Sequence, residues 1–292
     1  MKFAVIANPH KYEVKDVVAR TVKWASENKV TLLLSKEVCK LTKVTASPTV
    51  IETATDEHAI KESDFVVVIG GDGTILYTAR ISTKYNKPIL GINSGRLGFM
   101  TNTQPEDLEK ALHCLLKQDF KIDKRHYLKA TDLNGTVYYA LNEFLFTRRD
   151  STSMINITAI YDGDLINTYW ADGLIVASST GSTAYSLSSG GPIVAPGTGV
   201  MLVTPISPHT LTTRPLVVRS DRPLKIRIDQ QQASEVLFSY DGIMKEIETI
   251  PFEVEIIKSK LAFNLIHLPG QSYFETLRKK LMWGQDSRRI KN

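Results

Sequence analysis

The stretch Phe65-Val66-Val67-Val68-Ile69-Gly70-Gly71-Asp72-Gly73-Thr74 decides the fold class of this chain. An aromatic residue followed by four β-branched residues is typical of a strand buried on both faces of a parallel sheet. A glycine-rich turn ends the strand, and apolar periodicity from Ile75 to Tyr85 predicts a helix after it. A strand, a glycine turn and a helix N-terminus together form an anion site, because free backbone N–H groups and the helix dipole point at one spot.

Asp72 is the unusual residue of this turn, because a carboxylate repels phosphate. Its presence indicates a chemical role, such as accepting a proton or holding a metal. The alternative is that Asp72 only caps the helix, a position where aspartate is favoured, although Thr74 would serve equally well. The Gly-Gly-Asp-Gly pattern also occurs in several kinase families, so it favours phosphoryl transfer without naming a substrate. It is neither a Walker A loop nor a G-x-G-x-x-G fingerprint.

Length and composition are those of an ordinary globular protein. The 292 residues favour two domains, with 42% hydrophobic and 23% charged residues. The chain has no run of eighteen apolar residues, so no membrane span or membrane partner is expected. The N-terminal stretch lacks a charged segment followed by a long apolar one, and we expect a first strand there rather than a signal peptide.

Charge and cysteine content narrow the function further. A net charge of +5 suits small anionic ligands and does not predict nucleic-acid binding. The basic run from Arg278 to Lys291 is interpreted as a solvated helix and tail. Cys39 and Cys114 are too few for a disulfide framework or a zinc site, which is consistent with a reducing cytoplasm.

The first hundred residues alternate strand and helix signals. Strands are expected at 3–7, 30–34, 65–69 and 88–92, and helices at 12–28, 55–62 and 75–85, with a flexible loop at 42–50. Such alternation predicts a parallel sheet covered by helices on both faces, a Rossmann-like α/β fold. Ligands bind at the carboxyl ends of such strands, where the glycine turn lies.

After a helix at 104–118 the sequence becomes β-rich. Asn134-Gly135 and Asp162-Gly163 are hairpin signals. Short strands are expected at 173–178, 200–205, 215–219, 224–229, 235–240, 244–250, 252–258 and 261–266. This density predicts a β-sandwich-like domain. A last helix at 272–282 is expected to pack back on the first domain. The predicted domains are therefore 1–102 together with the helical segment 270–292, and 103–269.

Three polar segments of the chain are candidate ligand contacts. Asn142-Glu143 interrupts an apolar strand; it is either a strand end or a pair suited to a base edge and a ribose diol. Asp172 precedes a strand that runs into Ser178–Tyr185 and a short helix at 183–188, which is either a capped helix or a ligand-binding turn. The stretch Gly91–Phe99 holds Arg96, which contacts either phosphate or a carboxylate.

Taken in order, these blocks resemble the bacterial-type NAD kinase family. They are Gly70–Thr74, Gly91–Phe99, Leu141–Glu143, Asp172-Gly173, Thr180–Ser186, Thr204–Leu211 and Arg214–Leu216, and the resemblance runs from about residue 3 to 265. The most specific block is Thr180-Gly181-Ser182-Thr183-Ala184-Tyr185. Lipid kinases for diacylglycerol and sphingosine share the glycine turn but not that block.

The resemblance implies transfer of the γ-phosphate of ATP to the 2′-hydroxyl of the adenosine ribose of NAD, giving NADP, with a divalent metal such as Mg²⁺. It implies that Asp72 accepts the proton, that residues 1–102 bind nucleotide and that residues 103–269 bind NAD. The implied NAD contacts are Asp72, Gly73, Asn142, Glu143, Asp172, Thr180, Thr183, Ala184, Tyr185, Ser186 and Ser188. The implied ATP phosphate contacts are Gly70, Gly71, Gly73 and Thr74.

The resemblance further implies a homodimer or homotetramer in the cytoplasm, and it identifies no metal ligands. Because one adenosine must touch both segments, Asn142 and Thr183 are expected to lie close in space. Three departures from the family pattern are Ser178-Ser179, where Thr-Pro is frequent, Tyr77, where a basic residue is frequent, and Ile243, where a glutamine often follows the Asp-Gly pair found here as Asp241-Gly242. Two alternatives stay open at this point: a lipid kinase of the diacylglycerol or sphingosine type, and a non-catalytic NAD(P)-binding sensor.

Overall fold

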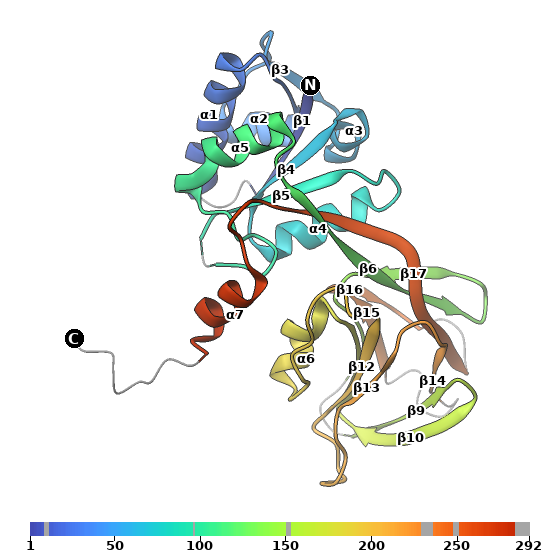
Figure 1. Cartoon of the computed structure of the whole chain (residues 1–292). Coiled ribbons are helices and arrows are strands. Elements are labelled where there is room, and N and C mark those ends of the chain that lie inside the picture. The colour runs from blue at the N-terminus through green and yellow to red at the C-terminus, as the bar shows by residue number, and fades with distance from the viewer. Residues whose placement is uncertain (9–11, 96, 150–152, 229–235, 248–250, 284–292) are drawn as a thin grey trace. The chain divides into compact units, whose positions relative to one another are not determined.

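A computed structural model describes the chain except for residues 9–11, 96, 150–152, 229–235, 248–250 and 284–292. The chain forms two compact units (Figure 1). The first comprises Met1–Lys124 and Phe263–Asn292, and the second comprises Arg125–Ala262. In the described residues, no helix is long and apolar enough to cross a membrane.

The first unit is built on a parallel sheet. Its strand order is β3 (Val50–Thr53), β2 (Thr31–Ser35), β1 (Lys2–Ala7), β4 (Phe65–Gly70) and β5 (Pro88–Asn93), followed by the end of β17 (Phe252–His267). This is the doubly wound order expected of a Rossmann-like domain, in which the chain reverses direction across the sheet between β1 and β4. All six residues of β4 are buried, as its sequence predicted.

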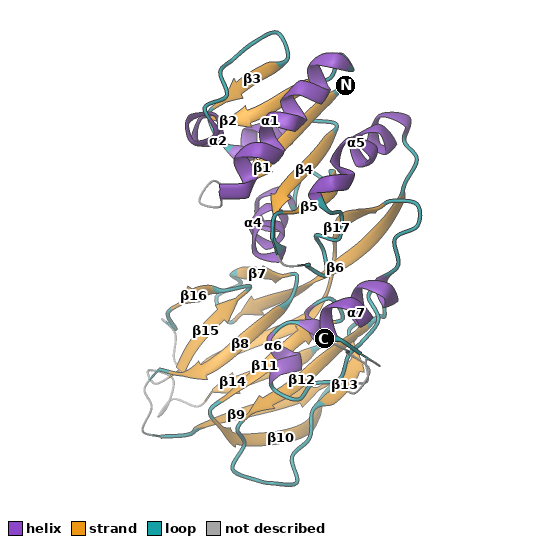
Figure 2. Ribbon diagram, turned by 90° about the vertical axis from the view of Figure 1, so that its left-hand side faces the viewer, coloured by secondary structure: helices purple, strands orange, loops and turns teal. Residues whose placement is uncertain are grey.

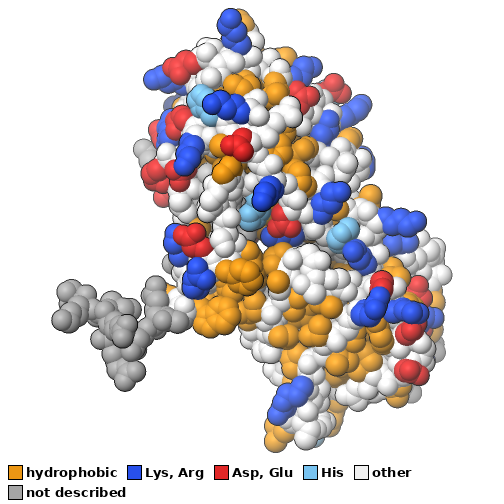
Figure 3. Space-filling view, in the orientation of Figure 1, with side chains coloured by type: hydrophobic (Ala, Val, Ile, Leu, Met, Phe, Trp, Pro, Cys, Tyr) orange, Lys and Arg blue, Asp and Glu red, His pale blue; other side chains and the backbone are white. Residues whose placement is uncertain are grey.

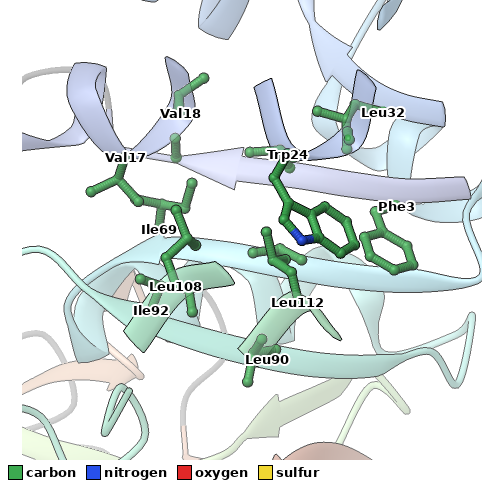
Figure 4. Close-up of a cluster of buried hydrophobic side chains, with 14 of the residues drawn as sticks. Phe3, Val17, Val18, Trp24, Leu32, Ile69, Leu90, Ile92, Leu108 and Leu112 are labelled. Carbon is green, nitrogen blue, oxygen red and sulfur yellow. The ribbon is translucent and has the colours of Figure 1, made fainter. Parts of the chain in front are cut away.

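Helices cover both faces of this sheet. They are α1 (Tyr12–Glu27), α2 (Lys36–Thr42), α3 (Asp56–Glu62), α4 (Asp72–Ser82) and α5 (Leu108–Lys117). The C-terminal helix α7 (Tyr273–Leu281) also belongs to this unit. On one face, Val17 and Trp24 of α1 and Leu112 of α5 pack with alternate strand residues such as Phe3 and Ile69 (Figure 4). Alternate residues of each strand serve the opposite face, which explains why these strands are apolar throughout.

The second unit consists of antiparallel strands (Figure 2). One sheet has the order β13 (Leu216–Arg219), β12 (Val200–Ile206), β11 (Gly173–Ser178), β8 (Glu143–Arg148), β15 (Val236–Tyr240) and β16 (Ile243–Lys245). Facing it are β10 (Asp164–Ala171), β9 (Ile155–Tyr161), β14 (Leu224–Ile228) and the first part of β17. A single apolar cluster, with Phe146, Phe238 and Ile226 at 0% exposure, draws on both sets of strands, which confirms the sandwich-like prediction.

Both predicted hairpins are present. Gly135 lies between β6 (Lys121–Asp132) and β7 (Val137–Ala140), and Asp162-Gly163 joins β9 to β10. The φ angles of 79° at Gly135 and 51° and 95° at Asp162 and Gly163 are the left-handed values that such turns require.

The structure corrects several predicted boundaries. The helix expected from Ile75 begins at Asp72, and the helix expected at 183–188 is a 3₁₀ turn, η2 (Gly181–Thr183), followed by α6 (Tyr185–Ser188). The strands expected at 252–258 and 261–266 are one long strand, β17. The strand expected at 244–250 is limited to β16, and residues 248–250 lie outside the described residues.

Two elements were not predicted: α2 at 36–42, and β3 at 50–53, which begins at the last residue of the loop expected at 42–50. Both are short, and two of the four β3 residues are exposed, so neither carries a strong apolar period. The compact units also differ from the predicted domain limits at 102 and 270. Arg20 of α1 donates to both carboxylate oxygens of Glu109 of α5, at 2.9 and 2.7 Å, which joins α5 to the first unit.

Charged side chains of both signs lie on the surface. On the face drawn in Figure 3, lysine and arginine side chains are interspersed with aspartate and glutamate and form no continuous basic surface.

Candidate active site

The Asp72 carboxylate holds a loop in place and does not cap its own helix. Gly71 is the N-cap of α4, and Asp72 is the first helical residue. Its Oδ2 accepts the N–H of Phe99 at 2.8 Å, and its Oδ1 accepts those of Met100 at 3.0 Å and Thr101 at 3.3 Å. The capping alternative is therefore wrong for Asp72.

Gly98 explains why the 91–99 block is rich in glycine. A Cβ at Gly98 would lie 2.2 Å from Oδ1 of Asp72 and 2.2 Å from Oγ1 of Thr101, which no real side chain tolerates. The loop therefore closes around the carboxylate because residue 98 has no side chain. Arg96, the candidate phosphate contact of this block, lies outside the described residues.

Two polar atoms at the carboxyl end of β5 are buried without a hydrogen-bond partner among the described residues. They are Oδ1 of Asn93 and Oγ of Ser94. Ser94 lies directly beside the glycine turn, because its N–H donates to the carbonyl of Gly70 at 3.1 Å. Since buried polar atoms are nearly always satisfied by protein, water or ligand, this edge of the sheet is suited to a polar ligand.

Gly73 contrasts with Gly98, because nothing in the fold requires it. It is exposed in the first turn of α4, has no positive φ, and a Cβ built on it meets no atom within 4 Å. A glycine in a helix costs about 0.5–1 kcal/mol relative to alanine. Its small size at an exposed helix N-terminus leaves space for a ligand to approach the backbone.

Asp241 organises a second polar cluster, within the second unit. Its carboxylate accepts the N–H groups of Leu141 at 2.6 Å, Asn142 at 2.8 Å and Glu143 at 3.2 Å. Sequence analysis noted the Asp241-Gly242 pair only as the site of a departure at Ile243 and missed this role. The turn between β15 and β16 was a local signal, but its partners lie about one hundred residues earlier in the chain.

The Ser178–Thr183 turn lies against the Asn142 backbone. The N–H of Ser178 donates to the carbonyl of Asn142 at 2.8 Å, and a Cβ on Gly181 would lie 2.2 Å from that same oxygen. Oγ of Ser178 donates to the Leu141 carbonyl at 2.5 Å and accepts the Gly181 N–H at 3.1 Å. The structure thus brings together the Asn142 segment and the turn that contains Thr180 and Thr183, as expected.

Glu143 has a strongly perturbed carboxyl group. Burial, with a smaller contribution from the charge of Asp241, raises its pKa to about 8. Its Oε2 is buried and has no hydrogen-bond partner among the described residues. The carboxyl group is therefore protonated at neutral pH and is able to donate as well as accept a hydrogen bond.

The other predicted NAD-contact residues differ in how exposed their side chains are and in whether these already have a partner in the protein. Tyr185 and Ser188 are exposed, and Thr183 and Ala184 are partly exposed. Asp172 pairs with Arg148 at 3.2 Å. Ser186 is fully buried and its hydroxyl bonds with that of Thr204 at 3.0 Å, so its side chain serves the core of the second unit in this state.

Comparisons with known proteins identify the family. The N-terminal domain model of ATP-NAD kinases matches residues 3–120, and the C-terminal domain model matches residues 141–268. An NAD kinase of Cytophaga hutchinsonii is 39% identical over 244 residues, covering 82% of this chain and 83% of its own. An NAD kinase of Flavobacterium psychrophilum is 32% identical over 299 residues, covering 99% of this chain and all of its own.

Solved structures agree with this result. A yeast NADH kinase complexed with NADH matches with a TM-score of 0.90 at 24% identity, covering 100% of this chain and 90% of its own; at this identity the match supports the fold. An NAD kinase from Archaeoglobus fulgidus in complex with ATP matches with a TM-score of 0.73 at 27% identity, covering 97% of this chain and 99% of its own.

The family matches define the chain as a phosphotransferase. The chain belongs to the ATP-NAD kinase family.

Replacing Glu143 by glutamine should alter stability in a pH-dependent way. Because the folded-state pKa lies above the unfolded value, the wild type loses stability as pH rises from about 4.5 to about 8. Glutamine does not titrate. The free energy of unfolding of Glu143→Gln, relative to that of wild type, should therefore be higher at pH 9 than at pH 5 by on the order of 2–4 kcal/mol. Urea unfolding at both pH values measures this.

The matched control is Glu255→Gln, at an exposed position of β17. Glu255→Gln measures the effect of the same substitution at an exposed surface position. An equal effect of Glu143→Gln at pH 5 and pH 9 would contradict a raised pKa at Glu143.

Proposed function

We infer that this chain is an NAD kinase that transfers the γ-phosphate of ATP to the 2′-hydroxyl of the adenosine ribose of NAD. The observation that carries this is the family match over 3–120 and 141–268. The intact glycine turn with Asp72 at the carboxyl end of a parallel strand supports it.

The reaction assigns a task to each part of the turn. The ribose oxygen forms a bond to the γ-phosphorus while the bond from that phosphorus to the bridging oxygen of ADP breaks, and the hydroxyl loses its proton. Asp72 is proposed as the acceptor of that proton. The backbone of Gly70, Gly71, Gly73 and Thr74 is proposed to hold the phosphates of ATP, because phosphoryl transfer depends mainly on positioning and on neutralising charge.

The NAD contacts are proposed to centre on the second unit. Asn142 offers an amide that donates and accepts toward the adenine edge, and the protonated Glu143 carboxyl both donates to and accepts from a ribose diol. The exposed and partly exposed residues Thr183, Ala184, Tyr185 and Ser188 complete the proposed surface, and Thr180 and Asp172 are proposed as further contacts. Ser186 supports this surface through Thr204.

A divalent cation fits the proposed reaction if it arrives with the substrate. No group of three or more His, Cys, Asp or Glu side chains able to hold a metal occurs in the part of the chain that the structure describes. Mg²⁺ in nucleotide sites usually keeps several waters and binds one or two carboxylates plus substrate phosphates. Asp72 is the carboxylate of the turn that would serve, and the ion would neutralise phosphate charge.

We further propose, from the family resemblance, a cytoplasmic location and a homo-oligomer of two or four subunits. The free cysteines Cys39 and Cys114 are consistent with a reducing compartment.

The first test is the reaction itself. Purified protein with ATP, Mg²⁺ and NAD should produce NADP, detected with an NADP-specific dehydrogenase. Phosphorylation of diacylglycerol but not NAD would favour the lipid-kinase alternative. Stoichiometric NAD binding without turnover would favour the non-catalytic sensor.

Gly73→Ala should separate folding from ligand binding. The added methyl meets no atom of the protein within 4 Å, so stability should stay equal or rise by up to about 1 kcal/mol. If ATP or NAD approaches the backbone at Gly73, its KM should rise, by roughly tenfold for a 1.4 kcal/mol clash. Thermal unfolding and steady-state kinetics measure the two effects.

Gly199→Ala is the matched control, because Gly199 also has open space around its Cβ position and no positive φ. Wild-type KM values in Gly73→Ala would show that no ligand passes close to that backbone.

Asp72→Asn should lose most turnover. The amide keeps one acceptor but removes the charge and basicity, so kcat should fall on the order of 10²–10⁴-fold, while NAD binding by calorimetry changes little. The amide NH₂ would face an N–H of the 99–101 loop, which should lower stability by about 1–3 kcal/mol.

A metal titration of Asp72→Asn distinguishes the roles left open for this residue. Partial recovery at high Mg²⁺ or Mn²⁺ would identify a metal ligand, and no recovery would favour the proton acceptor. A kcat near that of wild type would contradict both.

A further inference from the structure

The C-terminal helix contributes a cation to the Asp72 carboxylate. Nζ of Lys280, on α7, lies 3.3 Å from Oδ2 of Asp72. The same ammonium lies 4.5 Å from the ring centroid of Phe99, whose N–H donates to that same oxygen. The side chains of Lys280 and Asp72 are 32% and 27% exposed, so the pair is partly shielded from water. All of these residues belong to the first unit.

The 99–101 loop occupies the other hydrogen-bond acceptor positions of the Asp72 carboxylate, so Lys280 takes the remaining one. Oδ1 accepts from two backbone N–H groups and lies 3.4 Å from the Thr101 hydroxyl. Oδ2 accepts from one backbone N–H and from Lys280. A carboxylate offers about four lone-pair positions. The loop N–H groups are fixed by the backbone, whereas the lysine is a flexible side chain that can leave.

A closed ring of contacts holds α7 beside the 99–101 loop, so that Lys280 lies within 3.3 Å of the Asp72 carboxylate. The amide of Gln271, just before α7, donates to Oγ1 of Thr103 at 2.9 Å. Thr103 accepts the N–H of Asn93 at 2.8 Å, which ties the end of the 99–101 loop to β5. The ring of Tyr273 lies 6.5 Å from that of Phe99. The helix, the loop and the carboxylate therefore restrain one another, and Lys280 closes the ring.

We propose that Lys280 is a positioning residue for the phosphoryl transfer proposed above, acting through Asp72. It holds Oδ2 in one direction and occupies the acceptor position that a substrate hydroxyl must take. When the hydroxyl donates to Oδ2, the ammonium shifts from that acceptor position but stays beside the carboxylate, over the Phe99 ring, and continues to restrain its direction together with the loop N–H groups. The basic run at the C-terminus, interpreted from sequence as solvated, thus includes a lysine whose partner lies on another helix of the fold.

The test compares three variants in the full-length protein with ATP, Mg²⁺ and NAD. Lys280→Met keeps most of the side-chain volume and removes the charge, and Lys280→Arg keeps the charge. Lys279→Met is the matched control, because Lys279 is the neighbouring residue on α7 and pairs with Glu275 at 2.8 Å. For each variant, kcat, the KM values for NAD and ATP, and the melting temperature are measured.

Lys280→Met should lower kcat by about 10–100-fold, the scale on which misplacing a reacting group acts, with KM for NAD within about threefold of wild type. Lys280→Arg should recover most of that loss, and Lys279→Met should behave as wild type. Wild-type kcat in Lys280→Met would overturn the proposal. So would an equal loss in Lys280→Met and Lys280→Arg with lowered melting temperatures, which indicates a structural role, or a loss confined to KM for ATP.

The same assay separates this proposal from the one on which it rests. If the wild type makes no NADP, the proposed function fails and the role of Lys280 fails with it. If the wild type is active and Lys280→Met is equally active, only the role of Lys280 fails.

Discussion

The hydrogen bonds from three consecutive N–H groups to the Asp72 carboxylate are the constraint on which the proposed active site depends. They join the start of α4 to the loop after β5, two segments that meet because β4 and β5 are parallel neighbours. The contact requires a glycine at position 98. A group proposed to accept a proton is thereby held by the backbone, which satisfies the general requirement that catalytic groups be preorganised.

In the second unit, too, an aspartate carboxylate accepts hydrogen bonds from three consecutive backbone N–H groups. Asp241 holds the 141–143 segment through three N–H groups, just as Asp72 holds residues 99–101. In both cases a carboxylate fixes a short stretch of backbone through three N–H groups. The consequence for Glu143 is electrostatic: it is buried near a second carboxylate, and its pKa rises to about 8. A perturbed carboxyl group of this kind is a recurrent mark of a functional site.

Tyr77 shows how a departure from the family pattern is accommodated. At this position, where the family resemblance led us to expect a basic residue, the Tyr77 hydroxyl donates to Oδ2 of Asp56 at 3.1 Å. Burial, aided by the charge of Asp56, raises the pKa of Tyr77 to about 12, so the hydroxyl stays protonated. The position therefore provides a neutral donor instead of a cation, and positive charge near the turn comes from Lys280 of another helix.

Helices, strands and turns with strong local signals were predictable from the amino-acid sequence. The five-residue apolar run of β4, the two glycine hairpins and the amphipathic α1 and α5 depend on neighbours within a few residues, so periodicity and turn chemistry predict them. The ordered motifs likewise indicated the family. Weak local signals, as in α2 and β3, were missed because these short segments are set by packing against β2 and α1.

Tertiary structure alone decided which side chains meet. Asp72 with Lys280, Asp241 with the 141–143 backbone, and Gly181 with the Asn142 carbonyl are pairs separated by tens to hundreds of residues. No periodicity in the chain encodes such distances, because they follow from sheet order and from where a returning strand places the C-terminal helix. The sequence therefore identified Asp72 as chemically important, and only the fold revealed the partners that hold its carboxylate.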